Sequence, residues 1–212
     1  ETVSRMLAYA PVQHAATLRT LLAIHVNDLN EIKLYECDIK QAYLAAKMKR
    51  LVFVKHPPGY MLLTNKRGHL DYRKLMPGEK PPKTVMQLLL ALYGGMECGR
   101  LFWEVYTEFH YQLGFQKVAH EPCYLTFKRG DSFLKIPFHV DDSVIASKGE
   151  ALFEWYKEKL GARFEYTMRP LRNVLGVRYT IDYANKTIKM DQTEQAIKLL
   201  QQFDLAHAKP AK

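Results

Sequence analysis

The tetrapeptide His139-Val140-Asp141-Asp142 constrains this chain more than any other sequence feature. It lies between two apolar runs of strand character, at 132–138 and 143–147, and so predicts a β-hairpin with two adjacent carboxylates at its tip. Two like charges that point into one site repel each other, and bound divalent cations offset that repulsion. The alternative is that Asp-Asp serves only as turn chemistry, because aspartate tolerates turn dihedrals and hydrogen-bonds its own backbone.

A third acid, Asp38, ends an earlier strand-like run at 33–37. The elements predicted after it are a helix (97–113), the two hairpin strands, a helix (150–160) and a strand (163–166). This is a β-α-β-β-α-β order, in which the third strand lies beside the first. We therefore expect Asp38 to converge with Asp141 and Asp142. Three carboxylates supply the hard oxygen ligands that suit two Mg²⁺ or Mn²⁺ ions.

Composition narrows the class of protein. A chain of 212 residues that is 48% hydrophobic can bury a sizeable core. Its three cysteines are widely spaced and lack a Cys-x-x-Cys pair, which favours neither a disulfide framework nor a zinc site. The sequence has no apolar run of roughly 18 residues and no secretory signal pattern. We expect an intracellular protein, in a cytoplasmic particle or the nucleus, with no membrane partner.

The net charge of +9 is concentrated in one segment. Residues 47–83 contain ten Lys or Arg against Asp71 and Glu79, a net +8, so the rest of the chain is almost neutral. Cations interleaved with aromatic residues are typical of a nucleic-acid track, although a solvated, mobile insertion has the same composition. The candidate nucleic-acid-binding residues are Lys47, Lys49, Arg50, Lys55, Lys66, Arg67, Arg73 and Lys74.

The remaining elements are predicted from periodicity and turn residues. We expect an amphipathic helix at 17–29, and a loop through the Pro-, Gly- and Lys-rich stretch that ends at Pro82. A second hairpin is expected at 174–190. Asp191 is expected to cap the last helix, at 193–203.

Several motifs, in order, resemble the reverse transcriptase domain of copia-type LTR retrotransposons. Residues 38–44, Asp-Ile-Lys-Gln-Ala-Tyr-Leu, resemble polymerase motif A, and 56–60, His-Pro-Pro-Gly-Tyr, resemble its Gln-Pro-Pro-Gly-Phe. Residues 121–124, Glu-Pro-Cys-Tyr, are similar to Asp-Pro-Cys-Val-Tyr, and 139–142 stand where Tyr-Val-Asp-Asp is usual. No single motif is decisive, but their joint order is highly specific.

The resemblance implies an α+β fold, a right-hand polymerase palm with a ferredoxin-like β-α-β-β-α-β core and partial fingers. The whole of 1–212 would be one reverse transcriptase domain. Within it the palm would comprise 33–46 and 85–190, the partial fingers and basic insertion 1–32 and 47–84, and the start of the palm–thumb connection 191–212.

The resemblance also assigns site residues. The catalytic acids would be Asp38, Asp141 and Asp142, which bind metal together with the backbone of Ile39. The nucleotide-binding residues would be Ala42, Tyr43 and Arg100. Tyr43 matches the steric gate that excludes a ribose 2′-hydroxyl, although its spacing alone favours an ordinary buried aromatic residue.

The implied function is RNA-directed DNA synthesis by two-metal nucleotidyl transfer with two Mg²⁺ or Mn²⁺ ions. The implied partners are an RNA template, a DNA primer, deoxynucleoside triphosphates and the rest of a Pol polyprotein with ribonuclease H and integrase. The family's upstream fingers strand would precede residue 1. A different two-metal phosphotransferase or nuclease is a further alternative, because an acid triad alone does not fix the reaction.

Several departures from the family pattern favour another alternative, a catalytically degenerate fragment that binds RNA or DNA without polymerising. Motif B has Met96 and Glu97 in place of Lys-Gln, and an acid there is expected to weaken binding of an anionic triphosphate. Pro137 predicts an edge strand or a bulge before the acidic pair. Thr167 replaces the family's lysine. Arg169 or Arg172 could substitute for that lysine as a proton donor or phosphate contact, but both are interpreted as ordinary surface charges, and arginine hardly gives up its proton.

Overall fold

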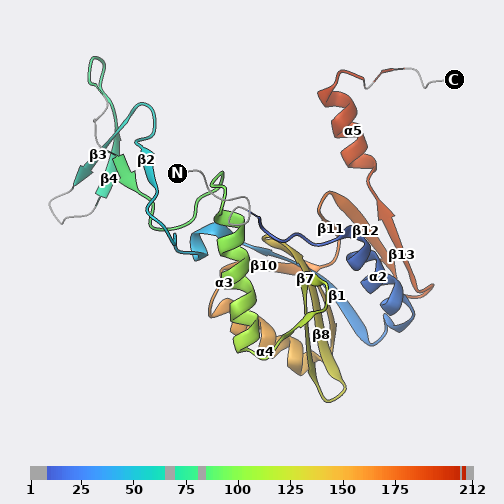
Figure 1. Ribbon diagram of the computed structural model, residues 1–212. Coiled ribbons are helices and arrows are strands. Elements are labelled where there is room, and N and C mark those ends of the chain that lie inside the picture. Colours follow the sequence, from blue (N-terminus) through green and yellow to red (C-terminus); the bar gives the residue numbers. More distant parts are fainter. Residues whose placement is uncertain (1–8, 65–69, 81–84, 206, 209–212) are drawn as a thin grey trace.

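A six-stranded antiparallel sheet forms the centre of the molecule (Figure 1). The computed structural model describes residues 9–64, 70–80, 85–205 and 207–208. Along the sheet the strand order is β10-β1-β9-β8-β7-β6. The strands are β1 (Ile32–Ile39), β6 (Gln116–Val118), β7 (Glu121–Arg129), β8 (Ser132–His139), β9 (Asp142–Lys148) and β10 (Tyr166–Pro170).

Two helices cover one face of this sheet. They are α3 (Cys98–Gln112) and α4 (Glu150–Gly161), and their apolar residues pack with Cys37 and Ile39 of β1 in the larger core. Gly114 lies just past the end of α3 with φ of 94°, the left-handed conformation that glycine adopts without strain. The helix predicted at 97–113 is therefore confirmed.

The opposite face of the sheet packs against α2 (Ala15–His25). Ile32 and Leu34 of β1 point to this face, because side chains alternate along a strand. After α2 the chain continues through a short 3-10 helix, η1 (Val26–Asp28), and the predicted amphipathic helix at 17–29 is confirmed with an earlier start.

The strand order agrees with the predicted topology. β9 lies between β1 and β8 and is antiparallel to both, so β1 and β8 run parallel, and β10 borders β1 on the other side. β6 and β7 extend the sheet beyond β8. The mixed α and β class with a large antiparallel sheet is thus confirmed, and the β-α-β-β-α-β order is present within it.

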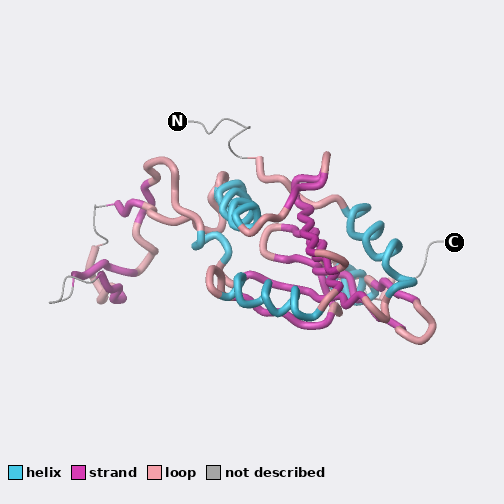
Figure 2. The backbone as a smooth tube through the Cα atoms, turned by 90° about the horizontal axis from the view of Figure 1, so that it is seen from below, coloured by secondary structure: helices cyan, strands magenta, loops and turns pink. Residues whose placement is uncertain are grey.

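The basic segment forms two β-ribbons that extend away from the central sheet in both views (Figures 1 and 2). β2 (Phe53–Lys55) pairs with β5 (Val85–Gln87), and β3 (Tyr60–Thr64) pairs with β4 (Leu70–Lys74). The prediction of a loop through Pro82 is wrong for β3 and β4, because ladder pairing overrode a composition that is typical of loops.

The C-terminal part adds a three-stranded sheet and an exposed helix. The strands are β11 (Asn173–Val174), β12 (Val177–Asp182) and β13 (Thr187–Asp191), which confirms the second hairpin. Helix α5 (Thr193–Gln202) follows, and the Thr193 N–H donates to the Asp191 carboxylate at 2.7 Å. None of the helices described is long and apolar enough to cross a membrane.

Two local predictions were wrong. β8 is an internal strand, so Pro137 does not mark an edge. The β8–β9 register is the same before and after Pro137, so no bulge is present; the ladder lacks only the pairs at 136 and 137, where proline has no N–H to donate. The strand predicted at 163–166 begins at its last residue and runs to Pro170.

Candidate active site

Asp38 and the Asp141-Asp142 pair meet at one edge of the central sheet. Asp38 lies opposite Asp142 in the β1–β9 register, and the Ile39 backbone N–H donates to the Asp141 carbonyl at 3.0 Å. Side chains of directly opposed residues in an antiparallel pair point to the same face, so Asp38 and Asp142 share the face that carries α2. The convergence predicted from topology is therefore present in the fold.

The turn that carries Asp141 holds a strained residue. His139 and Asp142 form the last ladder pair, so Val140 and Asp141 make a two-residue turn. Val140 has φ of 56°, which is rare for a β-branched side chain. Such conformations cost on the order of 1–3 kcal/mol and persist where the surrounding structure fixes them, as it does at many functional sites.

The acids repel one another. Burial raises the pKa of Asp142, and the neighbouring carboxylates of Asp141 and Asp38 raise it further. A divalent cation relieves such repulsion, and carboxylate oxygens are the ligands that Mg²⁺ and Mn²⁺ prefer, so the donor chemistry fits. Within the described ranges, no group of three His, Cys, Asp or Glu side chains lies close enough to hold one metal ion. The fold thus brings the donors to one edge without closing them around a single point.

A cavity of about 310 Å³ lies against Asp38 and Asp142. Asp141 is not among the residues that line this cavity. Partial desolvation of the Tyr93 hydroxyl, followed by the nearby Asp141 carboxylate, raises the pKa of Tyr93. Of the two adjacent acids, Asp142 therefore lines the cavity, and Asp141 lies near Tyr93. The residues that line the cavity are Glu36, Cys37, Asp38, Asp142, Thr167, Arg169 and Asn173.

Tyr43 lies beside Asp141. Gln41 adopts the left-handed conformation, with φ of 51°, and turns the chain into the 3-10 helix η2 (Ala42–Ala45), whose first residue is fully buried. Tyr43 is half-buried, and its ring centroid lies 4.4 Å from that of Tyr93. Burial, followed by the Asp141 carboxylate, raises the pKa of Tyr43. The predicted gate residue Tyr43 thus lies at the sheet edge that carries Asp38, Asp141 and Asp142, called the acid edge below. It also packs against the ring of Tyr93.

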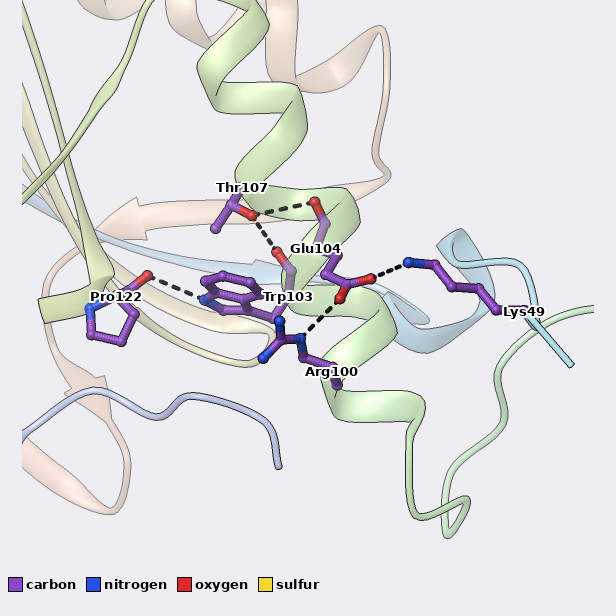
Figure 3. Close-up of polar contacts among 6 residues, drawn as sticks. All are labelled: Lys49, Arg100, Trp103, Glu104, Thr107 and Pro122. Carbon is purple, nitrogen blue, oxygen red and sulfur yellow. Dashed lines mark hydrogen bonds and ion pairs between the residues drawn. The ribbon is translucent and has the colours of Figure 1, made fainter. Parts of the chain in front are cut away.

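Arg100 is engaged by an acid on its own helix (Figure 3). Its Nε donates to Glu104 at 2.9 Å, and the guanidinium lies 4.8 Å from the centroid of Trp103. The other oxygen of Glu104 accepts from Lys49 at 2.6 Å. Two of the predicted cations, one for nucleotide and one for nucleic acid, therefore share one carboxylate of α3.

Glu97 does not present an uncompensated charge. Its buried carboxylate accepts two hydrogen bonds from Nε of Arg50, at 2.8 and 2.9 Å. Arg50 therefore offsets the charge of Glu97, and the expected weakening of triphosphate binding stays a prediction. Arg50 accordingly ties the basic segment to α3.

The other predicted cations are distributed over the two ribbons. Lys47 is exposed and lies in an isolated bridge with Leu90. Arg73 binds Glu79, with contacts of 2.6 Å. Two more exposed lysines are Lys55 and Lys74, whereas Lys66 and Arg67 lie outside the described residues.

Sequence comparison assigns the family. The profile of the family described as "Reverse transcriptase (RNA-dependent DNA polymerase)" matches residues 5–212. The chain belongs to this reverse transcriptase family. Reverse transcriptases act on nucleic-acid templates and generally use divalent metals, in agreement with the donor chemistry of the acid edge.

Two curated relatives are retrotransposon polyproteins of Arabidopsis thaliana. The Retrovirus-related Pol polyprotein from transposon RE2 is 21% identical over 95% of this reverse transcriptase chain, and that from transposon RE1 is 22% identical over 74%. The aligned parts are only 13% and 9% of those proteins. The resemblance to copia-type retrotransposons is therefore confirmed, and the chain spans a small part of the length of these relatives.

A solved structure of apo telomerase from Candida tropicalis, truncated from the C-terminal domain, is also similar. It is 11% identical, with 86% of this chain and 41% of that chain covered, and the TM-score is 0.39. A TM-score of this size is too low to define the details of the fold.

Two residues of this candidate site were missed from the sequence. Glu36 is a buried acid on β1 that lines the cavity beside Asp38, and Tyr93 lies next to Asp141. Glu36 could have been found, because it shares the strand face of Ile32 and Leu34 and a charge at a buried position needs a partner. Tyr93 could not, because its proximity comes from a loop with no periodic pattern.

Proposed function

We propose that this chain is the reverse transcriptase domain of a copia-type retrotransposon Pol polyprotein and that it polymerises DNA on an RNA template by two-metal nucleotidyl transfer. The observation that carries the proposal is the register pair of Asp38 with Asp142, with Asp141 bonded to Ile39 at the same sheet edge. The family assignment supports the reaction class.

In this proposal the central sheet with α3 and α4 is the polymerase palm. It comprises 33–46 and 85–190. Residues 1–32 and 47–84 form partial fingers and the basic insertion, and 191–212 begin the connection to a thumb. The exposed helix α5 supports the last assignment, because none of its residues is buried in this chain.

Asp38, Asp141 and Asp142 would hold two Mg²⁺ or Mn²⁺ ions, with the backbone of Ile39 beside the second. The bound ions would lower the pKa of the primer 3′-hydroxyl and stabilise the triphosphate and the leaving pyrophosphate. The chain's own contribution is position: the ladder fixes Asp38 against Asp142, and the strained Val140 turn fixes Asp141.

Around the reacting atoms, Tyr43 would contact the incoming deoxynucleotide, and its ring would exclude a 2′-hydroxyl. Ala42 is fully buried, so its part would be to position Tyr43 and not to touch the nucleotide. Arg100 would approach the triphosphate after exchanging Glu104 for phosphate oxygens. The exposed lysines of the two ribbons would contact the phosphates of the RNA template and DNA primer.

A second candidate is a fragment that binds nucleic acid without polymerising. One observation favours it: in the part of the chain described, three potential ligands do not gather at one point, and Asp141 lies against Tyr93. Such a protein would retain salt-sensitive binding and lack metal-dependent extension.

Primer extension on an RNA template with Mg²⁺ or Mn²⁺ tests the proposal. Asp141→Asn removes a ligand charge and is expected to abolish extension while binding to the primer–template stays within about twofold. Asp131→Asn is the matched control, because Asp131 is exposed in the turn between β7 and β8. Binding without extension in the unmodified chain would establish the second candidate instead. Equal loss of extension and binding in folded Asp141→Asn would contradict the proposal that the catalytic site and the nucleic-acid-binding surface are separate.

A further inference from the structure

Glu36 is a buried carboxylate on the strand that carries Asp38. Its side chain is 7% exposed, and it accepts hydrogen bonds from the backbone N–H groups of Arg172 at 2.7 Å and Asn173 at 2.6 Å. Nε of Arg169 donates to its other oxygen. A buried charge is tolerated when it is paired and hydrogen-bonded in this way. Glu36 therefore fixes Arg169 and the chain between β10 and β11 against β1.

The Arg169 guanidinium is hydrogen-bonded through one nitrogen, and its other two nitrogens are available to a ligand. Its side chain is 62% exposed. Among the described residues, its hydrogen bond to Glu36 uses Nε and leaves both Nη nitrogens without a protein partner. A planar guanidinium with two free Nη groups matches the geometry of a phosphate, which it can bind with two parallel hydrogen bonds.

The position of Arg169 relates it to the acid edge. On β1, Asp38 is flanked by Asp142 of β9 on one side and by Thr167 of β10 on the other, and Arg169 is opposite Glu36. Arg169, Asp38 and Asp142 line the same cavity of about 310 Å³. Because Glu36 and Arg169 neutralise each other, the cavity keeps two acids for cations and a guanidinium that can still donate to an anion.

We propose that Arg169, oriented by Glu36, binds a phosphate group of the ligand whose reacting end reaches Asp38 and Asp142. This inference rests on the proposed function, which brings a phosphate to the acid edge. The phosphate belongs either to the terminal phosphodiesters of the primer or to the triphosphate of the nucleotide. Glu36 is a positioning residue, since it touches the cation and not the ligand.

Four variants test this site. Arg169→Gln removes the guanidinium, and Glu36→Gln with Arg169→Gln removes it without leaving a buried acid unpaired. Arg129→Gln is the control, because Arg129 is an exposed arginine at the end of β7 that stacks on Trp155 at 4.7 Å. Glu36→Gln alone distinguishes the orientation of Arg169 from the net charge of the site. The substitution removes a negative charge, which by itself strengthens binding of nucleic acid, whereas loss of the orientation of Arg169 weakens binding.

Binding is measured by anisotropy with a fluorescent primer–template duplex over a range of NaCl, and with a fluorescent deoxynucleoside triphosphate in Mg²⁺. We expect Arg169→Gln and the double variant to bind the duplex about tenfold more weakly, with the salt slope reduced by about one, and Glu36→Gln to bind more weakly. If nucleotide binding weakens about tenfold instead, the phosphate is that of the triphosphate.

Arg169→Gln and the double variant behaving like Arg129→Gln in both assays would overturn the site. Tighter binding by Glu36→Gln would remove its positioning role. Failure of the proposed polymerase function can be told apart from failure of the Arg169 site. A chain that binds duplex and never extends a primer refutes the polymerase function, but the comparison of duplex binding among these variants still tests Arg169.

Discussion

At the residue scale, substitutions of Tyr43 can distinguish a role in packing from a role in selecting deoxynucleotides. Its ring packs on Tyr93 and lies edge-on to Phe102 at 6.4 Å, beside Asp141. If the ring blocks a 2′-hydroxyl, Tyr43→Ala lowers the preference for deoxynucleotides over ribonucleotides by at least about tenfold, because the excluded volume is lost. The ratio of kcat/KM for the two nucleotides on one template measures this preference.

Tyr43→Phe is the control for that prediction. It keeps the ring and its aromatic contacts and removes only the hydroxyl, so the preference is expected to stay within about twofold of the unmodified chain. An unchanged preference in a folded Tyr43→Ala protein would leave Tyr43 with packing alone.

His110 predicts how stability depends on pH. It is fully buried in α3, its Nδ1 donates to the Tyr106 carbonyl at 2.7 Å, and its Nε2 accepts from the Tyr156 hydroxyl at 2.9 Å. This arrangement needs the neutral ring, and burial lowers the pKa to about 4, although the bond to Tyr106 opposes the shift. In the unfolded chain the ordinary value is about 6.5.

Because the folded pKa is the lower one, the unfolded chain binds the proton more readily below pH 6.5. The stabilisation is complete above that pH and is lost at about 1.4 kcal/mol per pH unit as the pH falls towards 4. Urea unfolding at pH 7 and pH 5 measures the slope. In His110→Gln the slope is expected to fall by about one proton, and an unchanged slope would assign the pH dependence to other groups, such as His25, whose pKa is also lowered by burial.

At the scale of elements, Glu104 of α3 and Glu97, the residue just before α3, bind cations of the basic segment. Glu104 binds Lys49 and Arg100, and Glu97 binds Arg50. In the proposed function, nucleic-acid phosphates would compete with these carboxylates for the same cations. Glu104→Gln is expected to strengthen binding of RNA–DNA duplex several-fold with a steeper salt dependence, while stability changes by less than about 1 kcal/mol, since exposed ion pairs contribute little.

Glu108→Gln is the matched control for Glu104→Gln. Glu108 lies on the same helix and accepts a hydrogen bond from Gln112 at 2.9 Å, so the substitution removes the same charge without releasing a cation. Equal effects of the two substitutions on duplex binding would indicate general electrostatics and not competition.

The same elements show what the sequence could predict. Asp38 and Asp142 were placed together because strand periodicity and the β-α-β-β-α-β order determine which strand ends share an edge. The pairing of Lys49 with Glu104 could not be predicted, since it joins residues far apart in sequence through flexible side chains. β3 and β4 were missed because their Pro-, Gly- and Lys-rich surroundings hide a ladder that is set by pairing and not by composition.

At the scale of the whole molecule, the positive charge and the acid edge belong to different parts of the fold. The basic segment forms the two ribbons that extend from the sheet, whereas the acids lie at the end of β1 and at the β8–β9 turn (Figure 1). Binding and chemistry should therefore respond to different substitutions. The ribbon lysines are expected to set affinity and its dependence on salt.

Replacing Lys55, Lys74 and Lys80 together by Gln tests this separation, because all three are exposed on or beside the ribbons. If each neutralises one phosphate, the slope of log K against log salt falls by up to about three, while the extension rate at saturating duplex stays within about twofold. The same substitution at the exposed Lys117, Lys128 and Lys186 removes equal charge elsewhere and is expected to change the slope by less than one. Equal slopes in the two triple variants would mean that duplex responds to total charge, and the ribbons would then be a solvated insertion and not a nucleic-acid track.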